Sequence, residues 1–211
     1  GGDGQPPPEV RGRMTSLELA SKLVEAGADV NARVKDGGRR YTKGATPFLM
    51  ACKTADIDYL KRLLELGADP GLKDDDESTA LILAAGLGTH APDEVAGTED
   101  ECVEVVEFLH TLGADVNAVN KKGETAMHGA AYKSLPKVIR WLDDHGADIA
   151  IWNQKNRSGW TPLLIAQGFR PGNFRPLVPA IEAISVVMRK HGVEPPPPPD
   201  RETAKKKGYQ P

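Results

Sequence analysis

Residues 123–148 read GETAMHGAAYKSLPKVIRWLDDHGAD and contain the signals that predict the fold of this chain. Thr125 is placed to cap a helix of small residues, because a threonine side chain accepts a hydrogen bond from the first turn of the helix that follows it. Gly146 comes directly after the last apolar turn of a second helical pattern, where a left-handed glycine ends many helices. The stretch therefore predicts a helix, a turn, a second helix and a glycine cap.

The same unit recurs along the chain. Gly-Ala-Asp tripeptides and capping threonines alternate along the sequence. The tripeptides begin at Gly27, Gly67, Gly113 and Gly146, and the capping threonines are Thr46, Thr79, Thr125 and Thr161. Thr46 and Thr79 lie 33 positions apart, as do Gly113 and Gly146. Here the chain resembles the ankyrin-repeat family, whose unit has 33 residues and a Thr-Pro-Leu-His signature.

The resemblance implies an all-α solenoid of about five ankyrin repeats, each a helix-turn-helix with a β-hairpin loop, whose neighbours bury one another's apolar faces. We expect the first repeat to be incomplete. Pro6–Pro8 stand where its first helix would begin, whereas Thr15 and Glu18 form a capping box at the start of its second helix. Two interpretations stay open: residues 1–14 cover the exposed face as a cap, or the chain is a fragment or docks a neighbour on that face.

Deviations from the 33-residue unit divide the chain further. We expect a Pro/Gly-rich segment at residues 1–14, the repeat domain at residues 15–193 and a Pro-rich basic tail at residues 194–211, with inserts near residues 33–43, 86–101 and 169–179. Inserts at equivalent positions of a stack emerge on the same edge, and exposed loops usually carry function. The composition of the tail favours an extended segment. If that segment is ordered, we expect it to lie against a partner subunit or the array's own groove.

The composition excludes several classes of protein. Hydrophobic residues make up 39% of the chain and charged residues 27%, enough to bury a core rather than remain disordered. Two cysteines cannot build a disulfide scaffold. The longest uncharged apolar stretch, Ala80–Gly88, is too short to span a membrane. A net charge of −3 argues against general binding to nucleic acid, so we expect neither membrane insertion nor a nucleic-acid partner.

No catalytic, cofactor-binding or metal-binding constellation stands out in the sequence. The histidines are scattered, and neither a His-Glu-x-x-His nor a Cys-x-x-Cys motif is present. In the family that this chain resembles, a histidine at the position of His128 bonds back toward the threonine cap, here Thr125. We expect Cys52 and Cys102 to be small core residues rather than a pair. The sequence therefore predicts a protein that is not an enzyme and carries no cofactor; the alternative needs His90 and the acids of its insert to form a site.

The resemblance implies protein–protein recognition through the hairpin tips and the concave face. Aromatic residues make up only 5% of the chain, and Trp, Tyr and Arg dominate interface hot spots, so their positions are informative. The candidate contact residues are Arg39, Arg40, Tyr41, Lys43, Tyr132, Lys133, Trp152 and Trp160. The excess of basic residues in the first enlarged loop favours an acidic or mixed-charge protein partner. A solvated charged face is the other explanation for such a run.

A second hypothesis makes the chain a structural subunit or a fragment of a larger assembly, docked through its N-terminal half-repeat, its inserts and its Pro-rich tail. Neither hypothesis names the partner, since a fold alone does not determine function. Residues 44–49 and 123–132 are similar to bacterial ankyrin proteins, some of which are extracytoplasmic. The compartment, cytoplasmic or extracytoplasmic, is therefore open, and the periplasm is favoured by this resemblance alone.

Overall fold

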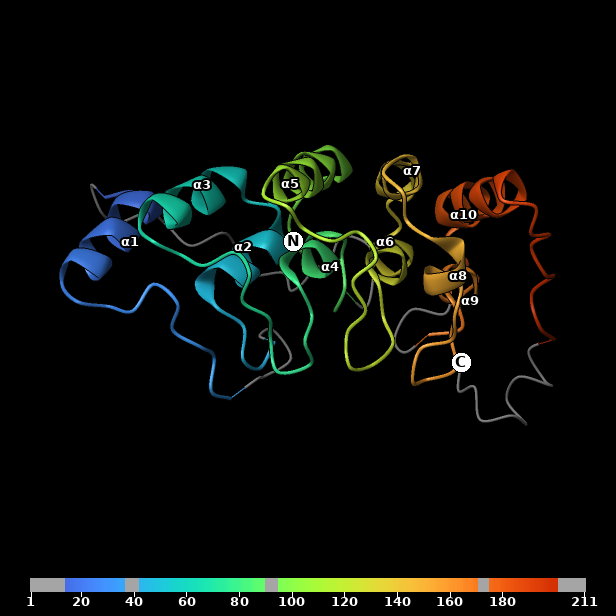
Figure 1. Cartoon of the computed structure of the whole chain (residues 1–211), viewed down its shortest axis with the longest axis horizontal. Helices are drawn as coiled ribbons and strands as arrows, with labels where there is room; N and C mark the ends of the chain where they lie inside the picture. The colour runs from blue at the N-terminus through green and yellow to red at the C-terminus, as the bar shows by residue number, and fades with distance from the viewer. Residues whose placement is uncertain (1–13, 37–41, 90–94, 171–174, 201–211) are drawn as a thin grey trace.

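The repeat unit predicted from the sequence forms two rows of helices. The computed structural model describes residues 14–36, 42–89, 95–170 and 175–200. The helices in these ranges are α1 (Ser16–Glu25), α2 (Pro47–Thr54), α3 (Ile57–Glu65), α4 (Ala80–Ala84), α5 (Glu99–Thr111), α6 (Ala126–Lys133), α7 (Pro136–Asp144), α8 (Ile149–Trp152), α9 (Pro162–Ala166) and α10 (Val178–Lys190). Figure 1 shows α1, α3, α5, α7 and α10 in an outer row and α2, α4, α6 and α9 in an inner row, with loops projecting beyond the inner row. The chain is an all-α ankyrin solenoid.

Threonines start the inner helices, as the sequence predicts. The Oγ1 atoms of Thr46, Thr79 and Thr161 each accept a hydrogen bond of 3.3 Å from the backbone N–H three residues later. In α6 the buried His128 closes the cap instead, since the backbone N–H of Thr125 donates to its Nδ1 atom at 3.2 Å. The role predicted for His128 is therefore confirmed. Each such bond satisfies a group that a helix terminus or its flanking residue would otherwise leave unpaired.

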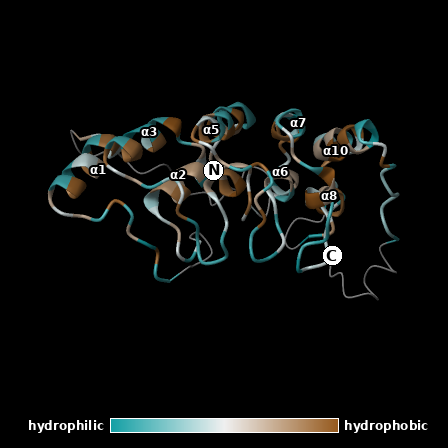
Figure 2. Cartoon of the chain, viewed as in Figure 1, coloured by the Kyte–Doolittle hydropathy of each residue, from teal (hydrophilic) through white to brown (hydrophobic). Residues whose placement is uncertain are grey.

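The core lies between the two rows and continues from repeat to repeat. Small residues let the inner helices approach closely: at Gly129, an added Cβ would come within 2.8 Å of the backbone nitrogen of Leu87. Cys52 and Cys102 are buried and free, so they are small core residues as predicted. Figure 2 shows the apolar faces of the two rows turned toward each other and hydrophilic residues along the loops. None of the described helices is long and apolar enough to cross a lipid bilayer.

The loops between repeats close as tight turns. The backbone N–H of Asn120 donates to the carbonyl oxygen of Glu124 at 2.9 Å, and that of Asn156 donates to the carbonyl oxygen of Trp160 at the same distance. The paired segments are so short that no strand forms in the part of the chain that the structure describes. The predicted β-hairpins are therefore hairpin-like turns.

A left-handed residue stands two positions before each capping threonine of the inner helices. Three of these residues are glycines: Gly44 and Gly123 have φ angles of 75° and Gly159 has a φ of 84°. The fourth is Glu77, with a φ of 61°. A side chain at positive φ crowds the following carbonyl oxygen, so the turn at Glu77 carries backbone strain that the other turns avoid.

The first outer helix, α1, lacks a described inner partner. Its capping box is present, with the Thr15 backbone N–H donating to the Glu18 carboxylate at 2.7 Å. Leu19 and Leu23, one helical turn apart, are 50% and 52% exposed. Residues 1–13, in which the sequence predicts no helix, lie outside the described residues.

Candidate functional site

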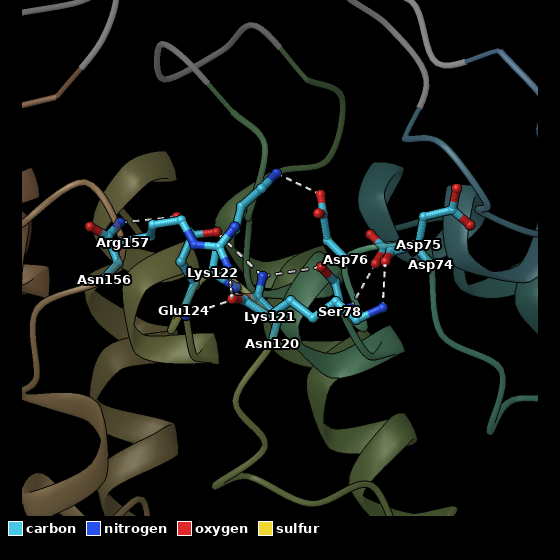
Figure 3. Close-up of polar contacts among 10 residues, drawn as sticks. All are labelled: Asp74, Asp75, Asp76, Ser78, Asn120, Lys121, Lys122, Glu124, Asn156 and Arg157. Atoms are coloured by element: carbon cyan, nitrogen blue, oxygen red, sulfur yellow. Dashed lines mark hydrogen bonds and ion pairs between the residues drawn. The ribbon is translucent and has the colours of Figure 1, made fainter.

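Hydrogen bonds join the tips of neighbouring loops into a continuous wall, and Figure 3 shows the part of it between Asp74 and Arg157 in close-up. At each junction, a backbone N–H of one tip donates to a carbonyl oxygen of the preceding tip. The pairs are Asp75 to Lys43 at 3.1 Å, Lys121 to Asp76 at 2.8 Å and Arg157 to Lys122 at 2.7 Å. The loop tips therefore hold fixed positions relative to one another, as a preorganised binding surface requires.

A row of buried polar side chains supports this wall from below. Asp74, Asn120 and Asn156 stand five positions before the capping threonines, and the Oδ1 atom of each accepts a backbone N–H four residues later, at 2.7 to 3.0 Å. The amide of Asn120 also donates to Ser78 Oγ at 3.2 Å, and that of Asn156 donates to Glu124 Oε1 at 3.1 Å. These bonds connect one repeat to the next, so each loop fixes its neighbour.

In the acidic run at residues 74–77, Asp74 is buried, whereas Asp76 and Glu77 form ion pairs with the neighbouring loop. Asp76 pairs with Lys122 at 2.5 Å, and Glu77 pairs with Lys121 at 3.4 Å. All four side chains are about half exposed. Such exposed pairs contribute about 0 to 1 kcal/mol each, so they select the register of the loops more than they stabilise the fold.

Between the wall and the inner helices lies a groove with a volume of about 500 Å³. Three of the candidate contact residues line it together, although they are far apart in the sequence: Lys43 on the first loop, Tyr132 on α6 and Trp160 on the last loop. Lys43 is exposed, and the two aromatic side chains are half-buried. The groove also contains charges of both signs, including Lys53, Asp74, Asp76, Lys122 and Glu124.

Several polar groups of this groove are buried without a counterpart. Asp74 Oδ2, Thr89 Oγ1 and Trp160 Nε1 have no hydrogen-bond partner within the described part of the chain. Burial raises the pKa of the Asp74 carboxyl. Burial also raises the pKa of Glu124, against hydrogen bonds from Asn120 and Asn156 that lower it. The groove therefore offers both acceptors and a donor to a ligand that brings complementary groups.

Two candidate contact residues lie in the interior, so the predictions that they meet a partner are wrong. Trp152 is 2% exposed, because the three additional residues of the last loop accommodate the short helix α8, capped by Asp148, which turns this ring into the core. Lys133 is 5% exposed, and its Nζ atom donates to the Ala96 carbonyl oxygen at 2.9 Å and to Cys102 Sγ at 3.4 Å. The burial of these two side chains could not be predicted from the sequence alone, because in each case it depends on a segment that folds over the residue.

Residues 39–41, which hold the candidates Arg39, Arg40 and Tyr41, lie outside the described residues. His90, the centre of the enzymatic alternative, lies outside them as well.

Two of the inserts anchor on the end of α6. Lys133 binds the segment after α4 through Ala96, and the buried Arg170, which follows α9, donates from Nη1 to the Tyr132 carbonyl oxygen at 2.6 Å. Gly97, with a φ of 98°, lies so close to Ala55 that an added Cβ would come within 2.7 Å of the alanine side chain. The described parts of these inserts are therefore packed against the repeats.

Comparisons with known proteins agree with this architecture. The family model described as "Ankyrin repeats (3 copies)" matches residues 95–177, and the one described as "Ankyrin repeat" matches residues 43–75. Together these two matches cover more than half of the chain.

Similar proteins of three kinds share the repeats. A mitochondrial disaggregase of Bos taurus is 31% identical over 72% of this chain and 19% of its own length. SH3 and multiple ankyrin repeat domains protein 2 of Homo sapiens is 30% identical over 73% of this chain and 9% of its own length. Ankyrin repeat, SAM and basic leucine zipper domain-containing protein 1 of Dasypus novemcinctus is 28% identical over 63% of this chain and 24% of its own length. The chain thus spans less than a quarter of each of these mammalian relatives, and the resemblance to bacterial proteins gains no support from them. The chain belongs to the ankyrin-repeat family.

Proposed function

We propose that this chain is a non-enzymatic module that binds a protein partner in the groove between its loop tips and inner helices. The observation that carries the proposal is the convergence of Lys43, Tyr132 and Trp160 on one groove whose lining contains buried polar atoms without partners. Ankyrin repeats generally mediate protein–protein interaction, and the repeats cover most of the described chain. Arg39, Arg40 and Tyr41, which precede Lys43 closely in the sequence, stay candidate contact residues of this proposal.

An extended segment of a partner protein suits this groove. A buried polar group without a hydrogen bond costs about 1 to 3 kcal/mol, and a peptide backbone brings both donors and acceptors. A partner carbonyl oxygen would accept from Trp160 Nε1, and a partner N–H or basic side chain would donate to Asp74 Oδ2. Because the lining carries both signs of charge, the partner surface should be of mixed charge.

Cross-linking and affinity capture from the native source test the proposal. Two substitutions, combined in a double groove variant, alter the groove while keeping its packing. Trp160→Phe removes the Nε1 donor and retains an aromatic ring, and Lys43→Glu reverses an exposed charge. Glu107→Lys, on the exposed side of α5 in the outer row, is the matched charge control. We expect a partner that the wild type and the Glu107→Lys variant capture and that the double groove variant loses. Equal capture by all three proteins would overturn the proposal.

One observation favours the second hypothesis, that the chain is a subunit or fragment of a larger assembly. Leu19 and Leu23 expose an apolar stripe on α1, a face that in the other repeats packs against an inner helix. Light scattering on the purified chain and on the Leu19→Glu/Leu23→Glu variant tests it. Self-association that the variant abolishes would support docking through this face, whereas a monodisperse monomer at all concentrations would count against it. Membership of a multi-subunit complex and an extracytoplasmic location stay proposals that rest on the sequence.

A further inference from the structure

Five consecutive prolines, Pro195–Pro199, follow the last outer helix, outside the repeat unit. Helix α10 ends at Lys190, Gly192 turns the chain with a φ of 74°, and the backbone N–H of Val193 closes the cap by donating to the Met188 carbonyl oxygen at 2.9 Å. From Pro195 to Pro199 the chain has no regular element. Figure 1 shows this segment beyond α10, at the end of the stack. None of its described residues lines the groove between the loop tips and the inner helices.

The proline run is conformationally fixed and its surface is accessible. Each proline ring holds φ near −65° and removes the N–H donor, so successive prolines form a polyproline II helix with three residues per turn. Pro196, Pro197 and Pro198 are exposed, and Pro195 and Pro199 are half-exposed. Among the described residues, no hydrogen bond is donated to the carbonyl oxygens of this run. The rings and carbonyl oxygens are therefore available to another molecule.

The residues that flank the run select one register. In a helix with three residues per turn, Pro196 and Pro199 lie on one edge, and Arg201 follows two positions after Pro199. The register of Pro195 and Pro198 would instead place the acidic Asp200 at that position. The segment thus has the form Pro-x-x-Pro-x-Arg.

We propose that residues 195–201 are a ligand for an SH3 domain of a partner protein. SH3 domains bind Pro-x-x-Pro segments in aromatic-lined grooves, which accept a preformed polyproline II helix at low entropic cost. Carboxylates beside such a groove pair with a basic residue that flanks the prolines, here Arg201, through charge-assisted hydrogen bonds. The ligand lies on the tail, so it is a second binding site separate from the proposed groove.

The sequence favours this class over other domains that bind polyproline. Some WW domains require a tyrosine next to the prolines. This chain has no tyrosine there, since Tyr209 lies ten positions beyond Pro199. EVH1 domains favour an aromatic residue before the run, where this chain has Glu194, which pairs with Arg189 at 3.8 Å. WW and EVH1 domains therefore serve as comparison probes.

The test titrates the full chain with purified SH3, WW and EVH1 domains, using an SH3 panel that covers domains selective for a C-terminal basic residue. The Pro196→Ala/Pro199→Ala variant removes the selected edge, and Pro197→Ala is its control, because Pro197 points away from a groove bound in this register. Arg201→Glu reverses the flanking charge, and Lys206→Glu makes the same change outside the motif. All of these substitutions lie outside the repeats, so we expect each variant to fold like the wild type.

We expect at least one SH3 domain to bind the wild type, with binding weakened about tenfold or more by the double proline variant and by Arg201→Glu, and changed less than about twofold by both controls. Absence of binding to every SH3 domain would overturn the proposal. So would binding that only WW or EVH1 domains show, or SH3 binding that the double proline variant leaves intact. Each outcome is independent of whether the groove variants lose their own partner.

Discussion

The buried histidine of α6 makes the stability of the array sensitive to mild acid. His128 has no exposed surface, and burial lowers its pKa to about 4 from an ordinary value of 6.5. In the unfolded chain the imidazole titrates near its ordinary pKa, so the unfolded state binds a proton at a higher pH than the native state does. The free energy of unfolding therefore falls as the pH drops through 6.5 toward 4.

The size of this effect follows from the two pKa values. One pKa unit corresponds to about 1.4 kcal/mol, so the full difference is worth about 3 kcal/mol, of which about 2 kcal/mol is lost between pH 7.5 and pH 5. For a urea dependence of roughly 2 kcal/mol per molar, that loss moves the unfolding midpoint by about 1 M.

The assay compares urea unfolding of the wild type and of His128→Leu at pH 7.5 and pH 5, followed by circular dichroism. Leucine suits the site, because Leu49 and Leu164 stand at the same position of other repeats. The variant should be less stable at pH 7.5, since Thr125 loses its hydrogen bond to the imidazole. Its midpoint should move about 1 M less than that of the wild type between the two pH values. Equal shifts in the two proteins would show that His128 does not titrate as its burial implies.

Three further predictions concern the loops and the insert. Glu77→Gly should raise the free energy of unfolding, measured by chemical denaturation, by about 0.5 to 1 kcal/mol, because glycine adopts the left-handed backbone without strain and the ion pair that is lost is exposed. Gly123→Ala should lower the free energy of unfolding by about 1 kcal/mol. If both variants changed the stability in the same direction, the strain argument would be refuted. Asn120→Ala should lower it by about 3 kcal/mol, since buried hydrogen bonds to two repeats are lost; a loss below about 1 kcal/mol would mean that the polar row does not join the repeats. Lys133→Met should speed hydrogen exchange in residues 95–98 and leave the other repeats unchanged, because the bond to Ala96 fixes that segment; unchanged exchange there would exclude this anchoring.

The architecture was predictable because its signals are local and repeated. A threonine cap and a glycine cap each act within one helical turn, and their recurrence predicts helix pairs without any knowledge of long-range contacts. The capping bond of His128 and the burial of Cys52 followed from the same unit. Groove residues such as Tyr132 and Trp160 were identified by residue type, since aromatic side chains are scarce in this chain.

The failures occurred where a side chain's surroundings come from a distant or irregular segment. Lys133 appears exposed by composition, but its burial depends on Ala96, 37 positions earlier, within an insert that no repeat pattern describes. Trp152 is a candidate contact residue by its type, but the short helix α8 turns it inward. The buried row of Asp74, Asn120 and Asn156 was also missed, although an Asp or Asn five positions before three of the four capping threonines, Thr79, Thr125 and Thr161, was a visible signal.

The groove between the loop tips and the inner helices is the surface that we propose binds a protein partner. Photo-cross-linking in an extract of the native source tests it most directly, with p-benzoylphenylalanine replacing Lys43 at the groove in one sample and Glu107 on the outer row in another. We expect a specific protein adduct from position 43, lost when Trp160 is also changed to Phe, and none from position 107. An adduct from position 107 alone, or one from position 43 that is unaffected by Trp160→Phe, would contradict the proposal.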